Sequence, residues 1–548
     1  MWKAVIILWF LQASPIWAQQ FQWVKTGSSI GQDAGQSITV GPSGAIYATG
    51  SFSDKAIFSG REYSGQGIFE IYIAKYSPEG DLLWLKTAGS YQNDEGLGIA
   101  TDSDENIYVA GYFSQTCLFG SGSHTVTLVS EGNTDIFLAK YTANGDLVWA
   151  QRAGGPKEDR ATNLKIDNYN NIYITGYFSD HSFFGTHTLT AQGSTDAFTA
   201  RYDGSGFCIW AHGLGGVGLD KALGLAVDTF GNVYATGFFY YGAFLSNAPA
   251  TLLADGNSSD IFVVAYNFSG DNILAERLGG PFNDAAYALA VDHQKNIYIT
   301  GYFLDEITFG SFYMNSYGYD DIFIVKYDST FTAEWAIHEG SVHLDIGMGI
   351  TVDQQGNIYV AGMFDSVGYF GQDTLFSQAY YDVFISKYNS KGILLWVRHA
   401  GGPEGDFARS LCIAPDGSLY LTGYYRNIAY FDMHATPFSR ENDIFIAKLS
   451  QPFTSSAVAT SPPEPFSFSV YPNPSSGQFY ISPASYHRES EVFSLRMFDI
   501  SGKLILQQKV KYEGQAAYLI SVSPFSPGTY QLQLQNSAIS HTQKIVLF

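Results

Sequence analysis

The chain of 548 residues is poor in cysteine and in basic residues. Its three cysteines, Cys117, Cys208 and Cys412, share no recurring spacing. An odd, unpatterned set excludes an ordered disulfide framework, and we expect three small buried hydrophobic groups instead. Lysine and arginine number 29 against 51 acidic residues, which gives a formal charge of −22. Phosphate binding requires basic patches, so this balance argues against nucleic acid as a partner.

Long apolar runs are also scarce. No run reaches the roughly 18 residues that a transmembrane helix needs, so no transmembrane segment is predicted. Residues 1–18 instead predict a secretory signal peptide, with Lys3 as the positive start, Ala4 to Leu11 as a short apolar run and Ala18 at the cleavage site. The mature protein is therefore expected to be exported and soluble.

Compact catalytic motifs are absent as well. The sequence contains no H-E-x-x-H motif and no P-loop motif. We therefore predict no catalytic residue, no metal ligand and no cofactor, and the sequence favours a role other than catalysis. The absence of motifs does not exclude an enzyme, because sites on repeat scaffolds are assembled from distant loops.

What the sequence does contain is a repeat of 61 to 65 residues. The segment Ile172-Tyr-Ile-Thr-Gly176 returns in variant form six more times, beginning at Ile46, Ile107, Val233, Ile297, Ile358 and Leu419. A fixed period that carries short strand patterns and turn signals is the signature of a propeller or a solenoid.

Each repeat carries four strand candidates, called a, b, c and d here. In the second repeat they cover Leu97–Thr101, Asn106–Phe113, Asp135–Tyr141 and Leu147–Arg152. Their many Ile, Val, Tyr, Phe and Trp residues suit a pleated surface that is packed on both faces. The last repeat lacks a d strand, whereas an extra d-like segment around Trp23 precedes the first a strand.

These patterns predict an all-β fold in which residues 19–449 form a seven-bladed β-propeller. Residues 21–29 are expected to complete the last sheet and thereby close the ring, which removes exposed sheet edges. The pattern D-x-x-G-N-I-Y-V-T-G around each b strand resembles the SBBP-type β-propeller repeat, over about four-fifths of the chain. This resemblance implies a propeller but no fixed activity.

Length variation is confined to the connections between strands b and c. The distance from each b motif to the acid that begins strand c is 24 residues, except for 28 in the second repeat and 27 in the fourth. The b–c connections share one face of the disc with the d–a connections, and binding residues collect on such loops. The insertions within Ser114–Thr134 and Tyr240–Ser259 predict a groove across the third blade, unless they are unused loop growth.

One aspartate recurs thirteen residues before each b motif. These candidate ligand-binding residues are Asp33, Asp94, Asp159, Asp220, Asp284, Asp345 and Asp406. One interpretation is an axial ring of carboxylates that collects cations, since hard ions prefer several oxygen ligands. The alternative is that each carboxylate accepts backbone N–H groups of its own turn, and sevenfold recurrence favours it because active sites break symmetry.

A Ser/Thr/Pro-rich linker, residues 450–466, separates the repeats from a C-terminal segment, residues 467–548. This segment carries a Y-P-N-P…G start, an F-D-x-x-G-K middle and a G-x-Y-x-L end. The residues of these motifs are Tyr471, Pro472, Asn473, Pro474, Gly477, Asp499, Gly502, Gly528, Tyr530 and, near the end of the chain, Lys544. Together they resemble the type IX secretion system C-terminal sorting domain, in its commonest form (type A).

This second resemblance implies a small Ig-like β-sandwich that directs export by a Gram-negative bacterium, with the type IX machinery as a partner. The mature protein is then expected to be secreted or attached to the outer-membrane surface. Many members of the family end on a basic residue, whereas this chain ends on Phe548.

The sequence therefore predicts a secreted or cell-surface module that binds a protein or a glycan through the b–c loop face. Two alternatives stay open: a carbohydrate-active hydrolase or lyase with its site in the same loops, and a passive structural or adhesive surface protein. Two nearby carboxylates, or an Asp/His/Tyr cluster in only one or two blades, favour the enzyme. Exposed aromatic side chains on the loop face favour binding.

Overall fold

The computed structural model describes residues 19–122 and 124–450, and in the C-terminal part residues 468–471, 478–483, 491–499, 503–512, 518–521, 526, 528–535 and 540–547. All regular elements in these residues are β-strands, so the expected all-β fold is confirmed. The chain divides into two compact units, Met1–Pro452 and Phe453–Phe548. The predicted signal peptide, and the predicted linker beyond Ser450, lie outside the described residues.

Within residues 19–450, the longer strands form antiparallel four-stranded sheets, numbered here in chain order. Sheet 1 consists of β2 (Ala34–Val40), β3 (Ile46–Phe52), β6 (Glu70–Tyr76) and β7 (Leu82–Ala88). Sheet 2 consists of β8 (Glu95–Thr101), β9 (Ile107–Phe113), β12 (Asp135–Tyr141) and β13 (Leu147–Ala153). Sheet 3 consists of β14 (Asp159–Ile166), β15 (Ile172–Phe178), β18 (Asp196–Tyr202) and β19 (Cys208–Gly215). Sheet 4 consists of β20 (Lys221–Val227), β21 (Val233–Tyr240), β24 (Ser259–Tyr266) and β25 (Asn272–Leu278).

The remaining three sheets have the same order of strands. Sheet 5 consists of β26 (Asp284–Val291), β27 (Ile297–Phe309), β28 (Phe312–Tyr327) and β29 (Ala333–Glu339). Sheet 6 consists of β30 (Ile346–Val352), β31 (Ile358–Phe370), β32 (Asp373–Tyr388) and β33 (Leu394–Ala400). Sheet 7 consists of β34 (Phe407–Ile413), β35 (Leu419–Asn427), β38 (Ser439–Leu449) and β1 (Phe21–Ser28).

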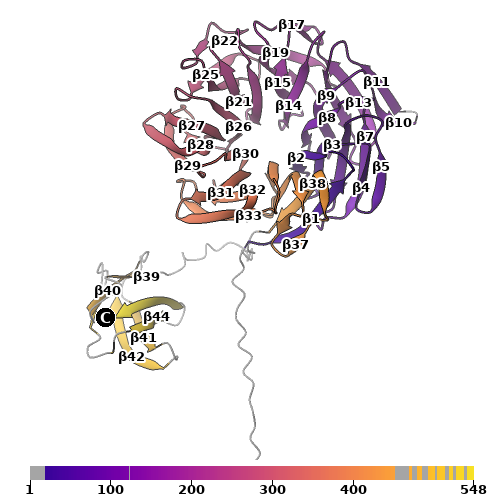
Figure 1. The fold of residues 1–548 in the computed structure, drawn as a ribbon. Coiled ribbons are helices and arrows are strands. Elements are labelled where there is room, and N and C mark those ends of the chain that lie inside the picture. The colour runs from indigo at the N-terminus through magenta and orange to yellow at the C-terminus, as the bar shows by residue number, and fades with distance from the viewer. Residues whose placement is uncertain are drawn as a thin grey trace, which may run out of the picture. The chain divides into compact units, whose positions relative to one another are not determined.

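Sheet 7 thus takes its fourth strand from the beginning of the chain. β1 pairs with β38 in a register that runs from Trp23 opposite Lys448 to Gly27 opposite Ile444. Figure 1 shows the indigo strand β1 beside the orange strand β38. Backbone hydrogen bonds therefore join the first and the last strand of the described part of the first unit.

The first strands of the seven sheets lie around a common centre in the described part of the first unit (Figure 1). Each first strand contacts the first strand of the next sheet, and β34 of sheet 7 contacts β2 of sheet 1. Small residues allow this close approach: a Cβ placed on Gly96 of β8 would lie 2.2 Å from Thr49 Oγ1 of the neighbouring sheet. Any larger side chain at this position would push the two sheets apart.

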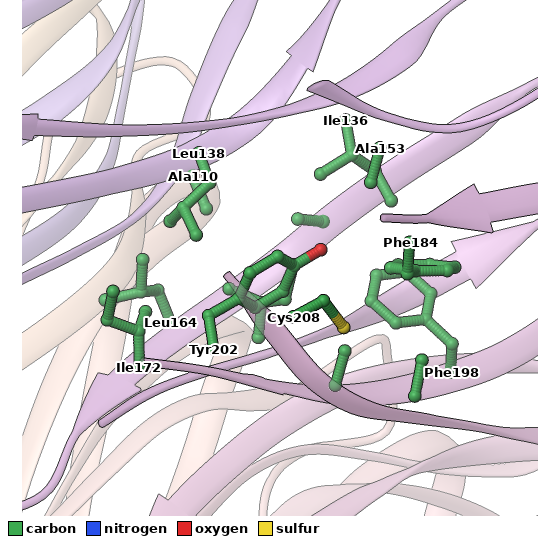
Figure 2. Packing of buried hydrophobic residues seen from close by; sticks show 14 of the residues in the cluster. Ala110, Ile136, Leu138, Ala153, Leu164, Ile172, Phe184, Phe198, Tyr202 and Cys208 are labelled. Carbon is green, nitrogen blue, oxygen red and sulfur yellow. The ribbon is translucent and has the colours of Figure 1, made fainter. Parts of the chain in front are cut away.

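Apolar side chains fill the spaces between adjacent sheets. In the layer between sheets 2 and 3, Ile136 and Leu138 of β12 pack with Leu164 of β14 and Ile172 of β15 (Figure 2). Every residue of β9 and of β15 is buried, because these strands have a neighbouring sheet on both faces. This burial explains their near-continuous apolar sequence.

The tight turns between first and second strands have a common chemistry. In sheet 4, Asp228 Oδ1 accepts hydrogen bonds from the N–H groups of Phe230 and Asn232, at 2.8 and 2.9 Å. The Asn232 side chain donates to Asp228 Oδ2 at 2.7 Å, and Gly231 has a φ of +79°. The recurring D-x-x-G-N pattern is therefore a turn in which an aspartate satisfies the backbone and a glycine takes the left-handed conformation.

The connections between second and third strands are β-hairpins rather than irregular loops. Five of them form short strand pairs: β4 (Lys55–Phe58) with β5 (Arg61–Ser64), β10 (Thr116–Ser121) with β11 (His124–Val129), β16 (His181–Phe184) with β17 (His187–Thr190), β22 (Gly242–Leu245) with β23 (Thr251–Leu253), and β36 (Tyr430–Phe431) with β37 (His434–Ala435). Two of these pairs extend the sheet before them to six strands: β4 pairs with β1 of sheet 7, and β22 pairs with β19 of sheet 3. In sheets 5 and 6 the hairpin simply extends the second and third strands.

The second unit contains two antiparallel sheets among its described residues. One consists of β39 (Phe468–Tyr471), β40 (Gln478–Pro483) and β43 (Tyr518–Ser521). The other consists of β42 (Leu504–Tyr512), β41 (Glu491–Asp499), β44 (Gly528–Gln535) and β45 (Ser540–Leu547). Across the described part of the chain, no helix has the length and apolar character needed to cross a membrane.

Candidate functional site

The seven aspartates predicted as an axial ring stand at the start of the first strand of each sheet. All are buried, with at most 1% of their surface exposed; they are Asp33, Asp94, Asp159, Asp220, Asp284, Asp345 and Asp406. Their repeated position follows from the repeat itself, because each stands at the start of the equivalent strand.

Each of these carboxylates accepts hydrogen bonds from the backbone. Asp220 Oδ2 accepts from the N–H of Gly216 at 2.8 Å, and its Oδ1 accepts from the N–H of Tyr240 at 2.9 Å. Asp345 repeats the arrangement in sheet 6, with a bond of 2.8 Å from the N–H of Asp365. One side chain thus ties the turn before the first strand to the segment after the second strand. These contacts favour the structural alternative, and ligand binding by the ring stays a prediction.

A second acid lies beside each of these aspartates. The sequence alone did not reveal this pairing. The second acid lies at or next to the start of the third strand of the preceding sheet in sheets 1 to 4, and within the longer third strand in sheets 5 to 7. Both acids of each pair are buried. The pairs are Glu70 with Asp94, Asp135 with Asp159, Asp196 with Asp220, Asp260 with Asp284, Asp321 with Asp345, Asp382 with Asp406, and Asp443 with Asp33. The described part of the first unit therefore has one carboxylate pair at every boundary between sheets.

Burial and the like charge of its neighbour change the protonation of each pair. Loss of hydration, followed by repulsion from Asp260, raises the pKa of Asp284 to about 8. Burial together with Asp382 does the same for Asp406, whose pKa rises to about 8. Two adjacent buried carboxylates cannot both ionise at low cost, so a shared proton is the favoured state near neutral pH.

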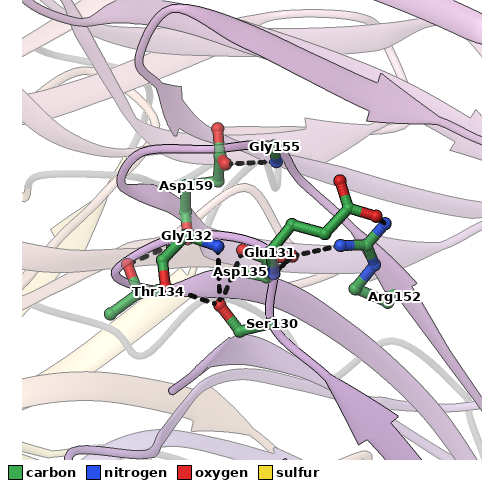
Figure 3. Close-up of polar contacts among 8 residues, drawn as sticks. All are labelled: Ser130, Glu131, Gly132, Thr134, Asp135, Arg152, Gly155 and Asp159. Carbon is green, nitrogen blue, oxygen red and sulfur yellow. Dashed lines mark hydrogen bonds and ion pairs between the residues drawn. The ribbon is translucent and has the colours of Figure 1, made fainter. Parts of the chain in front are cut away.

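Basic side chains on the fourth strands distinguish some pairs from others. Figure 3 shows the pair of Asp135 and Asp159, where Arg152 Nη1 donates to Asp135 Oδ2 at 2.8 Å. Arg277 forms the equivalent ion pair with Asp260, and His338 Nε2 lies 2.6 Å from Asp321 Oδ2. The matching positions in the other four sheets are Thr87, Gly213, His399 and Thr26. The change between basic and neutral residues at this one position of strand d is the sequence pattern from which these contacts could have been inferred.

The hairpins hold adjacent sheets together at the loop face. Residues in the first strand of a hairpin pair with the end of the fourth strand of the preceding sheet, as Phe244 does with Gly215 and Tyr369 with Gly340. A buried aromatic ring anchors several of them, for example Phe184 and Phe370. The predicted insertions of the second and fourth repeats lie in β10–β11 and around β22–β23.

Exposed aromatic side chains gather on the hairpins of sheets 5 and 6. In β28 they are Tyr313, Tyr317 and Tyr319, at 59, 49 and 68% exposure, and in β32 they are Phe376 and Tyr380, at 64 and 63%. The two hairpins touch, because the ring centroids of Tyr317 and Tyr369 lie 5.5 Å apart. We call these six residues the aromatic surface.

The described motif residues of the second unit lie on its strands. Tyr471 ends β39, Gly528 begins β44 and Lys544 lies in β45. Asp499 ends β41 and accepts a hydrogen bond from Lys503 N at 3.0 Å, and the Tyr530 hydroxyl donates to Ser526 O at 2.6 Å. The other predicted motif residues, which lie outside the described residues, are Pro472, Asn473, Pro474, Gly477 and Gly502.

Comparison with known protein families identifies the second unit. Residues 469–547 match the family described as "Secretion system C-terminal sorting domain". The predicted sorting domain is therefore confirmed, and it indicates type IX export of a secreted or cell-surface protein.

Known proteins resemble the first unit only distantly. The chain is 22% identical over 478 residues to an uncharacterized WD repeat-containing protein of Acanthamoeba polyphaga mimivirus, over 72% of this chain and 33% of that protein. It is 30% identical over 171 residues to the regulatory protein FlaEY of Caulobacter vibrioides, over 30% of this chain and 18% of FlaEY. The chain thus spans a third or less of the curated relatives it matches. A fungal alcohol oxidase of the AA5 family, solved with copper, aligns at 12% identity over 82% of this chain and 96% of the oxidase. Its TM-score of 0.30 carries no conclusion.

Proposed function

We propose that residues 19–449 form a seven-bladed β-propeller of SBBP-type repeats, and that residues 467–548 form an Ig-like sorting sandwich that delivers it outside the cell. The seven four-stranded sheets, the contact between β34 and β2, and the closing strand β1 support the propeller. The two antiparallel sheets of the second unit support the sandwich.

The exported propeller acts as a glycan-binding module, and the aromatic surface of sheets 5 and 6 carries this proposal. Large exposed aromatic patches on a soluble protein mark binding sites. Here hydrogen-bonding groups accompany the rings: the Tyr313 hydroxyl lies 2.7 Å from Glu306 Oε2 and 2.9 Å from Asn315 Oδ1.

A sugar ring matches this chemistry, because it has an apolar C–H face and a polar edge. Alternate residues of a strand point to the same side about 7 Å apart, so Tyr313, Asn315 and Tyr317 form one row along β28. The apolar face of a sugar can pack on a tyrosine while its hydroxyls meet the amide and the carboxylate.

The test is retardation of the full chain during native electrophoresis in gels that each contain one soluble polysaccharide, such as a glucan, a mannan, a xylan or a pectin. We expect retardation by at least one of them, and a loss of about tenfold in affinity in Tyr317→Ala and in Tyr380→Ala. The matched control is Tyr169→Ala, which removes a ring that is 70% exposed in a turn between first and second strands. Retardation that survives both changes, or that occurs with none of the polysaccharides, refutes the assignment.

A carbohydrate-active hydrolase or lyase is the second candidate, because sheet 5 holds an Asp/His/Tyr cluster. His338 lies 2.6 Å from Asp321 and its ring centroid lies 4.2 Å from that of Tyr317. The equivalent of Tyr317 is Gln378 in sheet 6 and Ser439 in sheet 7. If this cluster is catalytic, new reducing ends should form on the bound polysaccharide and disappear in His338→Gln, whereas binding persists. The absence of products with every retained polysaccharide excludes this candidate.

A further inference from the structure

A cavity of about 230 Å³ lies at the centre of the sheet ring of the first unit. Residues from the first strands of all seven sheets line it, and most of its polar groups come from four of them: Gln36 of β2, Thr162, Asn163 and Lys165 of β14, Tyr287 of β26 and Arg409 of β34. None of the seven ring aspartates is among the lining residues, all of which the structure describes. The cavity is therefore a different place from the buried carboxylate pairs.

The charge of this cavity is opposite to that of the protein. Its lining contains two cations, Lys165 and Arg409, and no carboxylate, whereas the whole chain carries a formal charge of −22. No carboxylate of the described residues lies within ion-pair distance of either group. Inside the ring the two cations thus have no counter-charge among the described residues, and an anion in the cavity would supply one.

The surrounding first strands change the environment of both cations, Lys165 and Arg409. The strands surround Lys165 while its side chain keeps accessible surface inside the cavity, and loss of hydration lowers the pKa of its amine. The Nε atom of Arg409 is buried and has no hydrogen-bond acceptor among the described residues. The guanidinium lies over the ring of Tyr424, 5.4 Å from its centroid, which holds it in place.

One acid, Glu95, contacts a residue of the cavity wall but does not itself line the cavity. Glu95 of β8 accepts hydrogen bonds from Gln36 at 2.7 Å, from Ser51 at 3.0 Å and from the Tyr112 hydroxyl at 3.2 Å. With three donors its carboxylate is already satisfied. An anion that enters the cavity would therefore meet the two cations without a competing protein carboxylate in the lining.

The other polar side chains of the lining are neutral, and the rest of the wall is mostly apolar. Thr162 Oγ1 donates to Ala222 O at 2.7 Å, and Asn163 Nδ2 donates to Leu223 O at 3.2 Å, so the neighbouring sheet orients both side chains. Together with the amide of Gln36 and the hydroxyl of Tyr287 they offer donors and acceptors on several sides. The volume is below the roughly 300–1,000 Å³ of typical ligand pockets, which limits an occupant to about one sugar residue.

We propose that this axial cavity binds a single sugar residue that carries one anionic group, a carboxylate or a sulfate, between Lys165 and Arg409. The hydroxyls of the sugar meet the amides and hydroxyls of the wall, and the two cations select the anionic group. This site is separate from the aromatic surface and does not depend on glycan binding there.

Isothermal titration calorimetry of the full chain tests the site with D-glucuronate, glucose 6-sulfate, D-glucose and inorganic phosphate. We expect one of the two charged sugars to bind, and D-glucose to bind at least tenfold more weakly. Lys165→Met and Arg409→Met should each weaken binding of the charged sugar about tenfold or more, whereas Lys165→Arg should largely restore it. The control Lys157→Met removes an exposed lysine outside the cavity and should change nothing.

Stability gives a second measurement, which also shows that the variants are folded. Because each cation is an unpaired charge in the free protein, Lys165→Met and Arg409→Met should keep or raise the melting temperature. Tyr317→Ala should leave binding of the charged sugar intact, so a failure of the aromatic surface and a failure of the cavity give different results.

Three results overturn the proposal. Equal affinity for D-glucose and the charged sugars excludes selection by charge, and no binding of either charged sugar at 10 mM excludes the site. Binding of inorganic phosphate as tight as that of the charged sugars excludes recognition of the sugar itself.

Discussion

Truncation of the two large side chains of β1 should weaken the whole first unit, because this strand closes the ring of sheets. Phe21 is 3% exposed and meets Phe431 edge-on, with ring centroids 5.0 Å apart. Trp23 is 9% exposed, and its Nε1 donates to Pro78 O of the neighbouring sheet at 3.3 Å. Both rings are thus fixed by residues that are distant in sequence.

The expected magnitude follows from burial. Truncation of a buried Phe or Trp to alanine typically costs about 3–5 kcal/mol. For a unit of about 430 residues, an unfolding entropy of about 2.1 cal/mol/K per residue converts this into a fall of about 3–5 °C in Tm. The double variant should lose about 6–10 kcal/mol if the two costs add, which is comparable with the total stability of a typical domain.

The assay combines thermal unfolding with hydrogen exchange. Phe21→Ala and Trp23→Ala should lower Tm and speed exchange of the amides of β38 that face β1, before those of the other sheets. Gln22→Ala is the matched control, since this residue lies between the two rings and its side chain is exposed. If the double variant melts within 1 °C of the control and β38 stays protected, β1 does not hold the ring closed.

Three further tests address the buried acids, the tail and the hairpins. Burial raises the pKa of Asp284 to about 8 from its ordinary 3.8, so the folded protein holds this proton more tightly than the unfolded chain does. The stabilising contribution of Asp284 is therefore complete below about pH 4 and is lost as the pH rises through about 8. Asp284→Asn should flatten this part of the Tm–pH curve. An unchanged slope contradicts the raised pKa of Asp284. Removal of residues 453–548 should leave the Tm of the first unit unchanged, because the two units are separately compact. The same truncation should abolish delivery to the surface in the native host, and continued delivery contradicts the sorting role. Shortening β10–β11 to the length of β16–β17 should preserve Tm, since the pairing of Leu118 with Gly89 remains. It should also reduce retardation in polysaccharide gels. Unchanged retardation contradicts the predicted binding groove across sheet 3.

Local chemistry explains which parts of the fold the sequence could predict. The turn from Asp228 to Asn232 is specified by residues within five positions, and its hydrogen bonds are those that the pattern implies. The extra segment around Trp23 could be assigned to the last repeat because every other repeat has a tryptophan or leucine at that place. A short-range residue pattern was sufficient for the turn, and the number of strands in each repeat was sufficient for the closing strand.

The carboxylate pairs show where this reasoning stops. Asp135 and Asp159 were both noticed as recurring acids, but the pair joins the third strand of one sheet to the first strand of the next. Strand patterns give the order of strands within a sheet, not which side chains meet across the boundary between sheets. The same holds for Lys165 and Arg409, which come from the third and seventh repeats and line one cavity only because the ring brings all first strands to one axis.

The first strands also show how a symmetric scaffold can carry an asymmetric site. The aspartate that begins each strand is the same in all seven repeats and is buried, because it holds a turn that every sheet shares. Three residues later the strands have different side chains at one position, namely Gln36, Leu97, Thr162, Leu223, Tyr287, Met348 and Arg409. These side chains line the cavity, where variation disturbs the apolar packing between sheets less than it would in the layers between them. Ligand-binding residues should therefore be sought at positions where the backbone repeats in every sheet but the side chain differs. The axial cavity and the hairpin surfaces of sheets 5 and 6 both meet this condition.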